Sequence, residues 1–346
     1  MSKLIIPLWI CCFLVFPKIT PAEVVTYRDV TGVEVGWYDA SYALVITLSD
    51  YQYAWGDLDF LNEDANRVAG ALMEQGFEVV RVNNPDHHAL TAEIQQFFDI
   101  YGQQRYSRLV VYIAGHGYTL GEMGYIVPVD TPLPQTDPTG FLATALEIKQ
   151  LQHIANQAPA NHVLCLIDGD LSPTRLDLNP GMVRPLSFTT SEPVRQFIIS
   201  GSDHQNQWNR SMIADQFAKI LYGKAGEIGK DGYLTGAEIG FYLQQRIALF
   251  SAGSQRLIFG QTGAGDVVFT TTPSLSYILA TQRALMRNEF YLNLIDVTRT
   301  DDPYSWQLLT RRYMRQPLAP LKESEETRKK KAEQTGKSVF GEEYDF

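Results

Sequence analysis

The fold class follows from residues 107–118, SRLVVYIAGHGY. Residues 109–114 form a short apolar run rich in β-branched and aromatic side chains. Such a run is typical of a buried strand in a parallel sheet that is covered on both faces. Gly115-His116-Gly117 follows it, which predicts a histidine at the carboxyl end of the strand, where open α/β sheets carry their active sites. Taken alone, the motif also fits a simple strand-ending turn.

A second stretch, residues 161–173 (NHVLCLIDGDLSP), repeats this arrangement. Residues 163–167 predict another buried strand, and Asp168-Gly169-Asp170 ends it in a polar turn. Further strands are predicted at residues 42–48, 77–82, 195–200, 257–259 and 267–269, with a hairpin within residues 23–40. Helices are predicted at residues 62–75, 89–101, 145–157, 212–222 and 235–250. This alternation predicts a parallel sheet with helices on both faces.

Together the two stretches resemble the caspase-like cysteine peptidases, in which one strand ends in His-Gly and a later strand ends in Asp-x-Cys-x-Ser-Gly. The resemblance continues in residues 43–50, 61–65, 76–79, 124–130, 194–202 and 231–240, and so covers roughly residues 40–270. It implies an α/β fold, a caspase-like three-layer αβα sandwich with a mostly parallel central sheet. The domain is expected to span residues 23–272.

The resemblance also implies roles for individual residues. His116 matches the catalytic histidine, and Gly117 would supply a backbone N–H to the oxyanion. Asp168 and Asp64 would line a pocket for a basic side chain. One position departs from the pattern, because Asp170 stands where the family has its cysteine nucleophile.

An aspartate at this position cannot replace the thiolate. A carboxylate that attacks an amide gives a mixed anhydride and must expel a poor leaving group, and its charge repels the developing oxyanion. Asp170 is expected instead to pair with protonated His116. The sequence therefore predicts a pseudopeptidase that binds a peptide or protein. The alternatives are an active caspase-like endopeptidase with an unusual nucleophile, and a metal site built from His116, Asp168 and Asp170.

Residues 227–238 (EIGKDGYLTGAE) have the length of a calcium loop. Glu227, Asp231 and Glu238 occupy ligand positions, but a glycine stands at the third position, so one ligand is missing. A capping box formed by Thr235 and Glu238 explains the same residues as the start of a helix. The capping box is the favoured interpretation, so no cofactor is predicted, with calcium as the alternative.

The amino-acid composition bears on the partners of the protein, and its N-terminal residues bear on its location. The net charge of −10 argues against nucleic acid as a partner, because phosphate binding needs clustered positive charge. Residues 1–22 have the basic start, apolar stretch and small terminal residues of a signal peptide, which predicts a secreted or periplasmic protein. An uncleaved membrane anchor is the alternative. Cys11 and Cys12 lie in this leader, so the mature chain would keep only Cys165, a buried residue in the middle of a strand.

Two segments follow the predicted domain. Residues 273–315 are expected to form a helical extension, with an amphipathic helix at residues 274–294. Residues 316–346 predict a disordered, charged tail. Its basic run at residues 328–331 could contact anionic lipid, but a solvated tail is favoured.

Overall fold

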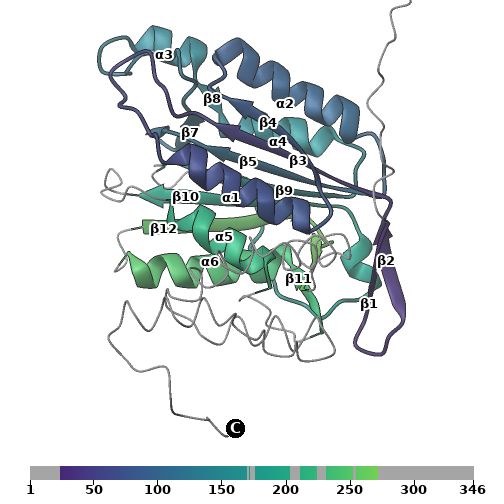
Figure 1. The fold of residues 1–346 in the computed structure, drawn as a ribbon. Coiled ribbons are helices and arrows are strands. Elements are labelled where there is room, and N and C mark those ends of the chain that lie inside the picture. Colours follow the sequence, from purple (N-terminus) through teal and green to yellow (C-terminus); the bar gives the residue numbers. More distant parts are fainter. Residues whose placement is uncertain are drawn as a thin grey trace, which may run out of the picture. The chain divides into compact units, whose positions relative to one another are not determined.

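The computed structural model describes residues 24–169, 171, 176–202, 211–223, 231–251 and 255–271 (Figure 1). All of them belong to one compact unit, Met1–Ser274. The predicted leader, the whole helical extension and the whole charged tail lie outside the described residues, as do Asp170 and Glu227.

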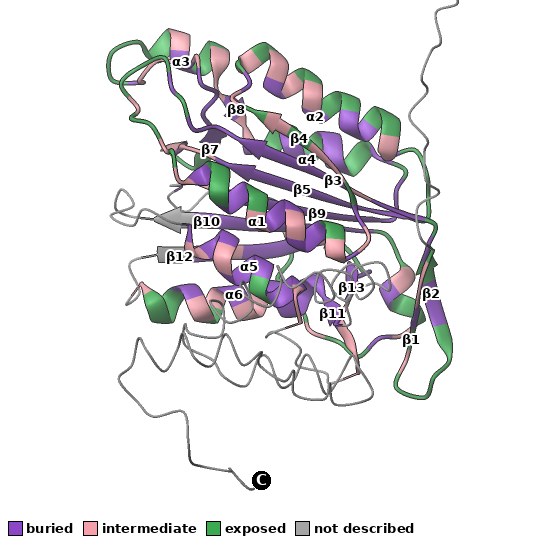
Figure 2. Cartoon of the chain, viewed as in Figure 1, coloured by how far each residue is buried: buried purple, intermediate pink, exposed green. Residues whose placement is uncertain are grey.

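A six-stranded sheet forms the centre of this unit, in the order β12-β10-β9-β5-β3-β4. Its strands are β3 (Ala40–Thr47), β4 (Glu78–Asn83), β5 (Ser107–Ala114), β9 (His162–Asp168), β10 (Val194–Ser202) and β12 (Gln255–Gly263). Every neighbouring pair is parallel except β10 and β12, which are antiparallel. Every residue of β5 and β9 is buried, as their apolar runs predicted (Figure 2).

Helices cover both faces of the sheet, which confirms the predicted three-layer architecture (Figure 1). Helices α1 (Leu61–Glu74), α5 (Met212–Leu221) and α6 (Gly236–Phe250) pack on one face, against side chains such as Val110 and Tyr112 of β5. Helices α2 (His87–Tyr101) and α4 (Ile148–Gln157) and the short α3 (Pro138–Thr144) contribute to the opposite core, which contains Val111 and Ile113. Side chains therefore alternate between two cores along β5, as the pleat of a strand requires.

Helix α1 ends at Glu74, one residue before the predicted end at residue 75. Gly76 follows it with φ of +82°, and the Phe77 N–H donates to the Leu72 carbonyl, 3.1 Å away. This left-handed residue closes the helix and turns the chain into β4, which favours glycine at this position. Near this end Leu72 is buried, whereas Met73 is 53% exposed. Met73 lies one residue beyond Leu72, and that step rotates its side chain away from the core.

Several small elements were not predicted. Strands β6 (Gly117–Leu120), β7 (Met123–Ile126) and β8 (Leu146–Glu147) form a three-stranded antiparallel sheet directly after His116. Strand β11 (Tyr233–Thr235) and the short 3-10 helix η1 (Phe188–Ser191) were not predicted either. Strand β13 (Val268–Thr270), which pairs with β11, matches the strand predicted at residues 267–269. The hairpin of β1 (Val25–Arg28) and β2 (Glu34–Tyr38) matches the predicted hairpin.

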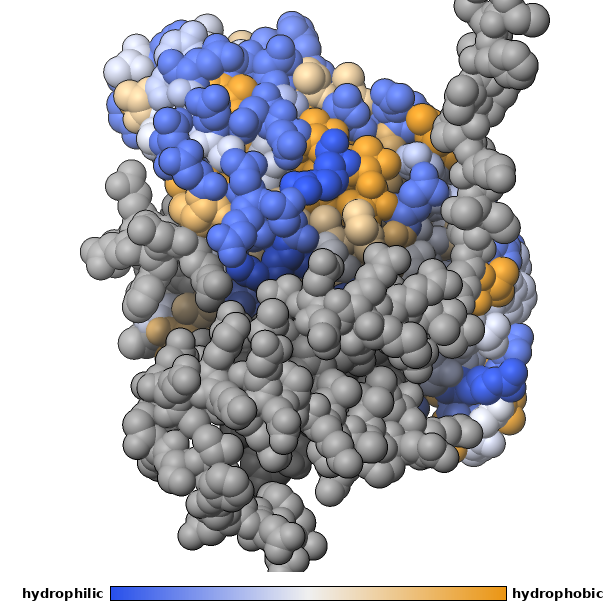
Figure 3. All heavy atoms as spheres, in the orientation of Figure 1, coloured by the Kyte–Doolittle hydropathy of each residue, from blue (hydrophilic) through white to orange (hydrophobic). Residues whose placement is uncertain are grey.

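The two edges of the central sheet differ. At β12, Asn179 of the connector between β9 and β10 exchanges two backbone hydrogen bonds with Gln261, of 2.9 and 2.8 Å. At the other edge, β4 has no further strand among the described residues. Figure 3 shows apolar side chains at the surface between α1 and α2, where β4 lies. The exposed charged residues Glu78 and Arg81 interrupt β4, as charges commonly do in edge strands.

Across the described part of the chain, no helix is both long enough and apolar enough to cross a membrane.

Candidate functional site

The two predicted site segments lie side by side at the carboxyl ends of β5 and β9. The Gly115 N–H donates to the Asp168 carbonyl, 3.1 Å away. A Cβ atom on Gly169 would lie 3.3 Å from the Gly117 nitrogen, so the two turns are in close contact. The structure thus brings His116 and Gly117 next to Asp168 and Gly169. Asp170 follows at once but lies outside the described residues.

The segment between β3 and α1 fixes His116 in place. Its Tyr51 hydroxyl accepts the His116 backbone N–H at 2.7 Å, and the Gly56 carbonyl oxygen lies 2.9 Å from the His116 Nε2. A carbonyl can only accept, so this contact assigns the proton to Nε2. The rings of Tyr51 and Trp55 pack on the imidazole, with centroids 4.8 and 5.6 Å from it. Both the main chain and the ring of His116 are therefore held.

Gly115 permits this arrangement through its small size. A Cβ atom at this position would lie 2.6 Å from the Leu48 Cβ and 2.8 Å from the Tyr51 hydroxyl. Such distances are shorter than any ordinary carbon contact, so a larger residue would push Tyr51 away from His116.

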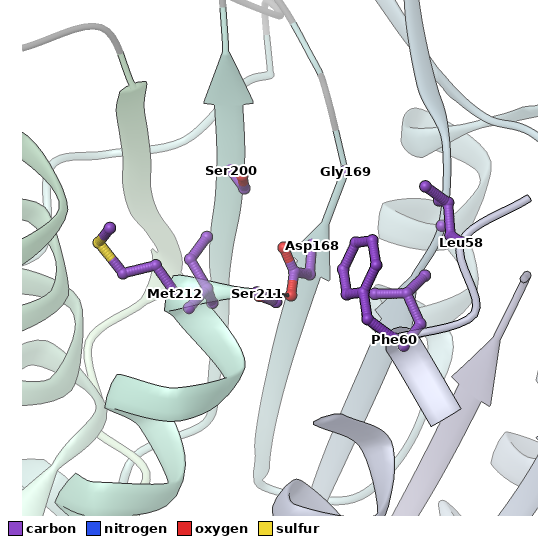
Figure 4. A pocket seen from close by; sticks show the side chains of 10 residues that line it. Leu58, Phe60, Asp168, Gly169, Ser200, Ser211 and Met212 are labelled. Atoms are coloured by element: carbon purple, nitrogen blue, oxygen red, sulfur yellow. Dashed lines mark hydrogen bonds between the residues drawn. The ribbon is translucent and has the colours of Figure 1, made fainter. Parts of the chain in front are cut away.

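A recess opens beside these strand ends (Figure 4). Its walls come from the segment before α1, the ends of β9 and β10, and the start of α5; they are Leu58, Phe60, Leu61, Gly115, Asp168, Gly169, Ser200, Ser211, Met212 and Ile213. Figure 4 shows the Asp168 carboxyl group between Ser211 on one side and the Phe60 ring on the other. The recess therefore combines apolar walls with one carboxyl group.

Hydroxyl groups hold the Asp168 carboxylate. The Tyr112 hydroxyl donates to Oδ2 at 2.9 Å, and the Ser211 hydroxyl donates to the same oxygen (Figure 4). Burial and the charge of Asp168 raise the pKa of Tyr112 well above its ordinary value, so the phenol keeps its proton and remains a donor. Asp168 is thus fixed in position, as a binding residue must be.

Asp64 lies beside this group but does not line the recess. It is only 2% exposed. Its Oδ1 accepts from Arg67 at 2.7 Å, and its Oδ2 accepts the backbone N–H of Ser211 at 2.6 Å. The structure places the two predicted pocket residues on either side of Ser211.

Cys165 is fully buried in β9, as predicted. Burial raises the pKa of its thiol to about 12, so the thiolate is scarcely populated at neutral pH. Cys165 is therefore unsuited to act as a nucleophile.

The capping box predicted at α6 is present. The Thr235 hydroxyl accepts the Glu238 N–H at 3.2 Å, and the Glu238 carboxylate accepts the Thr235 N–H at 2.8 Å. Asp231 accepts the Tyr233 N–H at 3.0 Å. Within the described residues, no group of three or more histidine, cysteine or acidic side chains is arranged to hold a metal ion. The calcium loop and the metal site of His116, Asp168 and Asp170 each include a residue outside that part of the chain.

Four residues that support the predicted site residues were not predicted: Tyr51, Trp55, Gly56 and Ser211. Tyr51 and Trp55 could have been identified from the sequence, because large aromatic side chains in a short connector usually pack against other residues.

A family model described as the caspase domain matches residues 40–217, just over half of the 346 residues. The matched range includes both His116 and Asp168. No curated protein sequence matches the chain. Among solved structures, the crystal structure of the Drosophila initiator caspase Dronc matches with a TM-score of 0.44 and 8% identity, over 65% of this chain and 80% of that chain.

Proposed function

The chain belongs to the caspase family, and from this we propose that it is an exported member without peptidase activity that binds a peptide or protein ligand. The observation that carries the proposal is Asp170, which the resemblance places at the position of the family's cysteine nucleophile. The recess lined by Gly115 and Asp168 supports the binding part of the proposal.

The chemistry of the remaining groups agrees with an inactive enzyme. A caspase-type reaction needs a thiolate beside the histidine. Cys165 is buried in the sheet, with a thiol pKa raised to about 12, and Cys11 and Cys12 lie in the predicted leader. A carboxylate at position 170 forms an anhydride that reverts to starting material, so bond cleavage does not proceed.

The recess suits a basic side chain. Leu58, Phe60 and Met212 offer apolar walls to the methylene stem of a lysine or arginine, and Asp168 offers its charged end a carboxylate. The carboxylate is held by Tyr112 and Ser211, so a ligand would meet it already oriented. Preorganised groups of this kind lower the cost of binding.

Calorimetric titration of the mature chain with short peptides that differ at one position tests this proposal. We expect lysyl and arginyl peptides to bind at least tenfold more tightly than the glutamyl peptide, because only a cation pairs with Asp168. Asp168→Asn should remove this preference. Asp39→Asn, an exposed change before the amino end of β3, is the matched control and should retain it. Equal affinity of the wild type for basic and acidic peptides would refute the proposed ligand class.

A further inference from the structure

A second recess lies at the amino end of the central sheet, away from the strand ends that carry His116 and Asp168. Figure 1 shows the β1–β2 hairpin at this end. The walls come from that hairpin, from η1 and from the starts of β5 and β9; they are Tyr27, Gly36, Trp37, Tyr38, Tyr106, Asn161, His162 and Ser191. This aromatic recess shares no residue with the recess beside Asp168.

Trp37 and Tyr106 form the exposed part of the aromatic recess. Their side chains are 41% and 38% exposed, and the two rings stack with centroids 4.8 Å apart and an interplanar angle of 28°. The stacking covers one face of the Trp37 ring, and the described residues place no other ring against it. A large aromatic surface is therefore open to a ligand.

The hydroxyl groups deeper in the aromatic recess are bonded within the protein. The Tyr27 hydroxyl donates to Ser191 Oγ at 3.2 Å, because the Ser191 proton itself goes to a backbone carbonyl 2.5 Å away. The Tyr38 hydroxyl donates to His162 Nδ1 at 2.5 Å, and the other ring nitrogen donates to a backbone carbonyl at 3.1 Å. A ligand with many hydroxyl groups, such as a sugar, would find few partners here.

All eight lining residues are uncharged at neutral pH. Burial lowers the pKa of His162 to about 3, so its imidazole stays neutral. Burial also raises the pKa of Tyr27 and of Tyr38 above the ordinary value, so both phenols keep their protons. The walls therefore offer no ionic partner to a charged ligand.

Two guanidinium groups behind these walls disfavour a cation. The Arg105 guanidinium carbon lies 5.7 Å from the centroid of the Tyr106 ring, and that of the buried Arg108 lies 5.0 Å from the centroid of Tyr38. They already use the attraction of these rings for positive charge, and they would repel a second cation. Neither arginine lines the aromatic recess, so an anion would not be paired there.

We propose that the aromatic recess binds a neutral, proline-rich segment of a partner protein. Charge and hydrogen-bond complementarity favour this occupant. Proline has no backbone N–H, so the segment brings only acceptors, and its carbonyls can remain in water because a polyproline II helix keeps its backbone solvated. Its apolar rings suit the open surface of Trp37 and Tyr106, as in other aromatic grooves that bind such segments. The Trp37 Nε1–H, for which the described residues provide no acceptor, can donate to one carbonyl.

Calorimetric titration of the mature chain with decaproline, capped at both ends, tests the proposal. A capped glycine-serine peptide of equal length and a neutral trisaccharide are the comparison ligands, and we expect only decaproline to bind. Trp37→Ala should weaken its affinity at least tenfold, because the open aromatic surface is lost. Trp37→Phe keeps a ring without the N–H and should cause a smaller loss. Phe250→Ala, which removes a half-exposed ring at the end of α6, is the matched control and should cause none.

NMR of the wild type locates the peptide without relying on the fold of a variant. The indole N–H resonance that is missing in Trp37→Phe should shift on addition of decaproline. Asp168→Asn should leave the affinity for decaproline unchanged, which separates this inference from the ligand proposed for the other recess. The inference is wrong if millimolar decaproline does not bind, if Trp37→Ala binds it as well as the wild type, or if the trisaccharide binds more tightly.

Discussion

Asp266 is a buried carboxyl group that the candidate site does not use. It is 4% exposed, and its Oδ1 accepts from the Gln196 side chain at 2.8 Å and from the Ala237 N–H at 3.1 Å. Burial raises the pKa of Asp266 to about 7, and the charge of the neighbouring Glu238 adds to the rise. Two tyrosines, Tyr27 and Tyr38, also have charge interactions with Asp266, and both interact with the charge of Arg108.

Because the folded-state pKa of Asp266 lies above its ordinary value of 3.8, the folded protein binds this proton more tightly than the unfolded chain. The free energy of unfolding should therefore fall as the pH rises from about 4 to about 7, by up to roughly 4 kcal/mol. Asp266→Asn keeps the acceptor oxygen and removes the titration. Urea unfolding at pH 5 and pH 8 should show the variant to be more stable than the wild type at pH 8, with a flatter pH dependence. An unchanged pH dependence in the variant would contradict this assignment.

At the residue scale, the site positions that could be predicted were those next to buried strands. His116 and Asp168 follow apolar runs, and parallel strands bring such ends together. Their supports could not be found this way. Gly56 and Tyr51 reach His116 across 60 and 65 residues, and Ser211 reaches Asp168 across 43. Contacts over such separations depend on the packing of whole elements and leave no local pattern in the sequence.

At the scale of an element, the start of α6 is a structure that a local sequence pattern predicted. Thr235 and Glu238 satisfy each other's backbone donors, as the sequence predicted. Thr235→Ala should lower the free energy of unfolding by about 1 kcal/mol, the usual loss for an N-cap, and Thr235→Ser should restore most of it. Chemical unfolding of the three proteins measures both effects.

Millimolar calcium should leave the melting temperature unchanged, and stabilisation that Asp231→Ala abolishes would favour a metal loop instead.

The connector over β12 is a second element whose role can be tested. A Cβ atom on Gly260 would lie 2.7 Å from the Leu178 Cβ and 3.1 Å from the Asn179 carbonyl oxygen. Gly260→Ala should therefore push the connector away from the edge strand and speed cleavage by endoproteinase Asp-N before the exposed Asp177, as mass spectrometry of a digestion time course would show.

Gly70→Ala provides the matched control for this substitution. A Cβ atom at Gly70 of α1 would lie 3.5 Å from the Tyr222 hydroxyl, an ordinary contact. Within a helix the change should stabilise the protein by about 0.5–1 kcal/mol and leave cleavage before Asp177 unaffected. Equal cleavage rates in wild type and Gly260→Ala would show that the connector does not depend on this contact.

Edge elements were the least predictable part of the fold. The central strands were predicted because burial on both faces demands an apolar run. Strand β12 spans nine residues, yet only residues 257–259 carried a strand signal. Its remaining residues include Gln261, Thr262 and Gly263. They adopt strand structure by pairing with β10, and their side chains show no strand pattern. The strands of the β6–β7–β8 sheet are also short, and they contain both polar and apolar side chains.

At the scale of the whole molecule, export determines the compartment in which the protein would bind its ligand. We expect the mature N-terminus at Glu23 or within two residues of it, because residues 20–22 are small residues suited to cleavage. Intact-mass spectrometry of the protein from its native cells checks this. Soluble cytoplasmic protein that still carries Met1 would contradict export.

Turnover of fluorogenic peptides by the purified mature chain decides whether the protein lacks peptidase activity. Lysyl, arginyl, aspartyl and neutral substrates should be offered to the wild type, to His116→Ala and to Asp170→Cys, which restores the family's pair of residues. We expect no turnover of any substrate by the wild type, at the same background as His116→Ala. Turnover by the wild type that disappears in His116→Ala would contradict it.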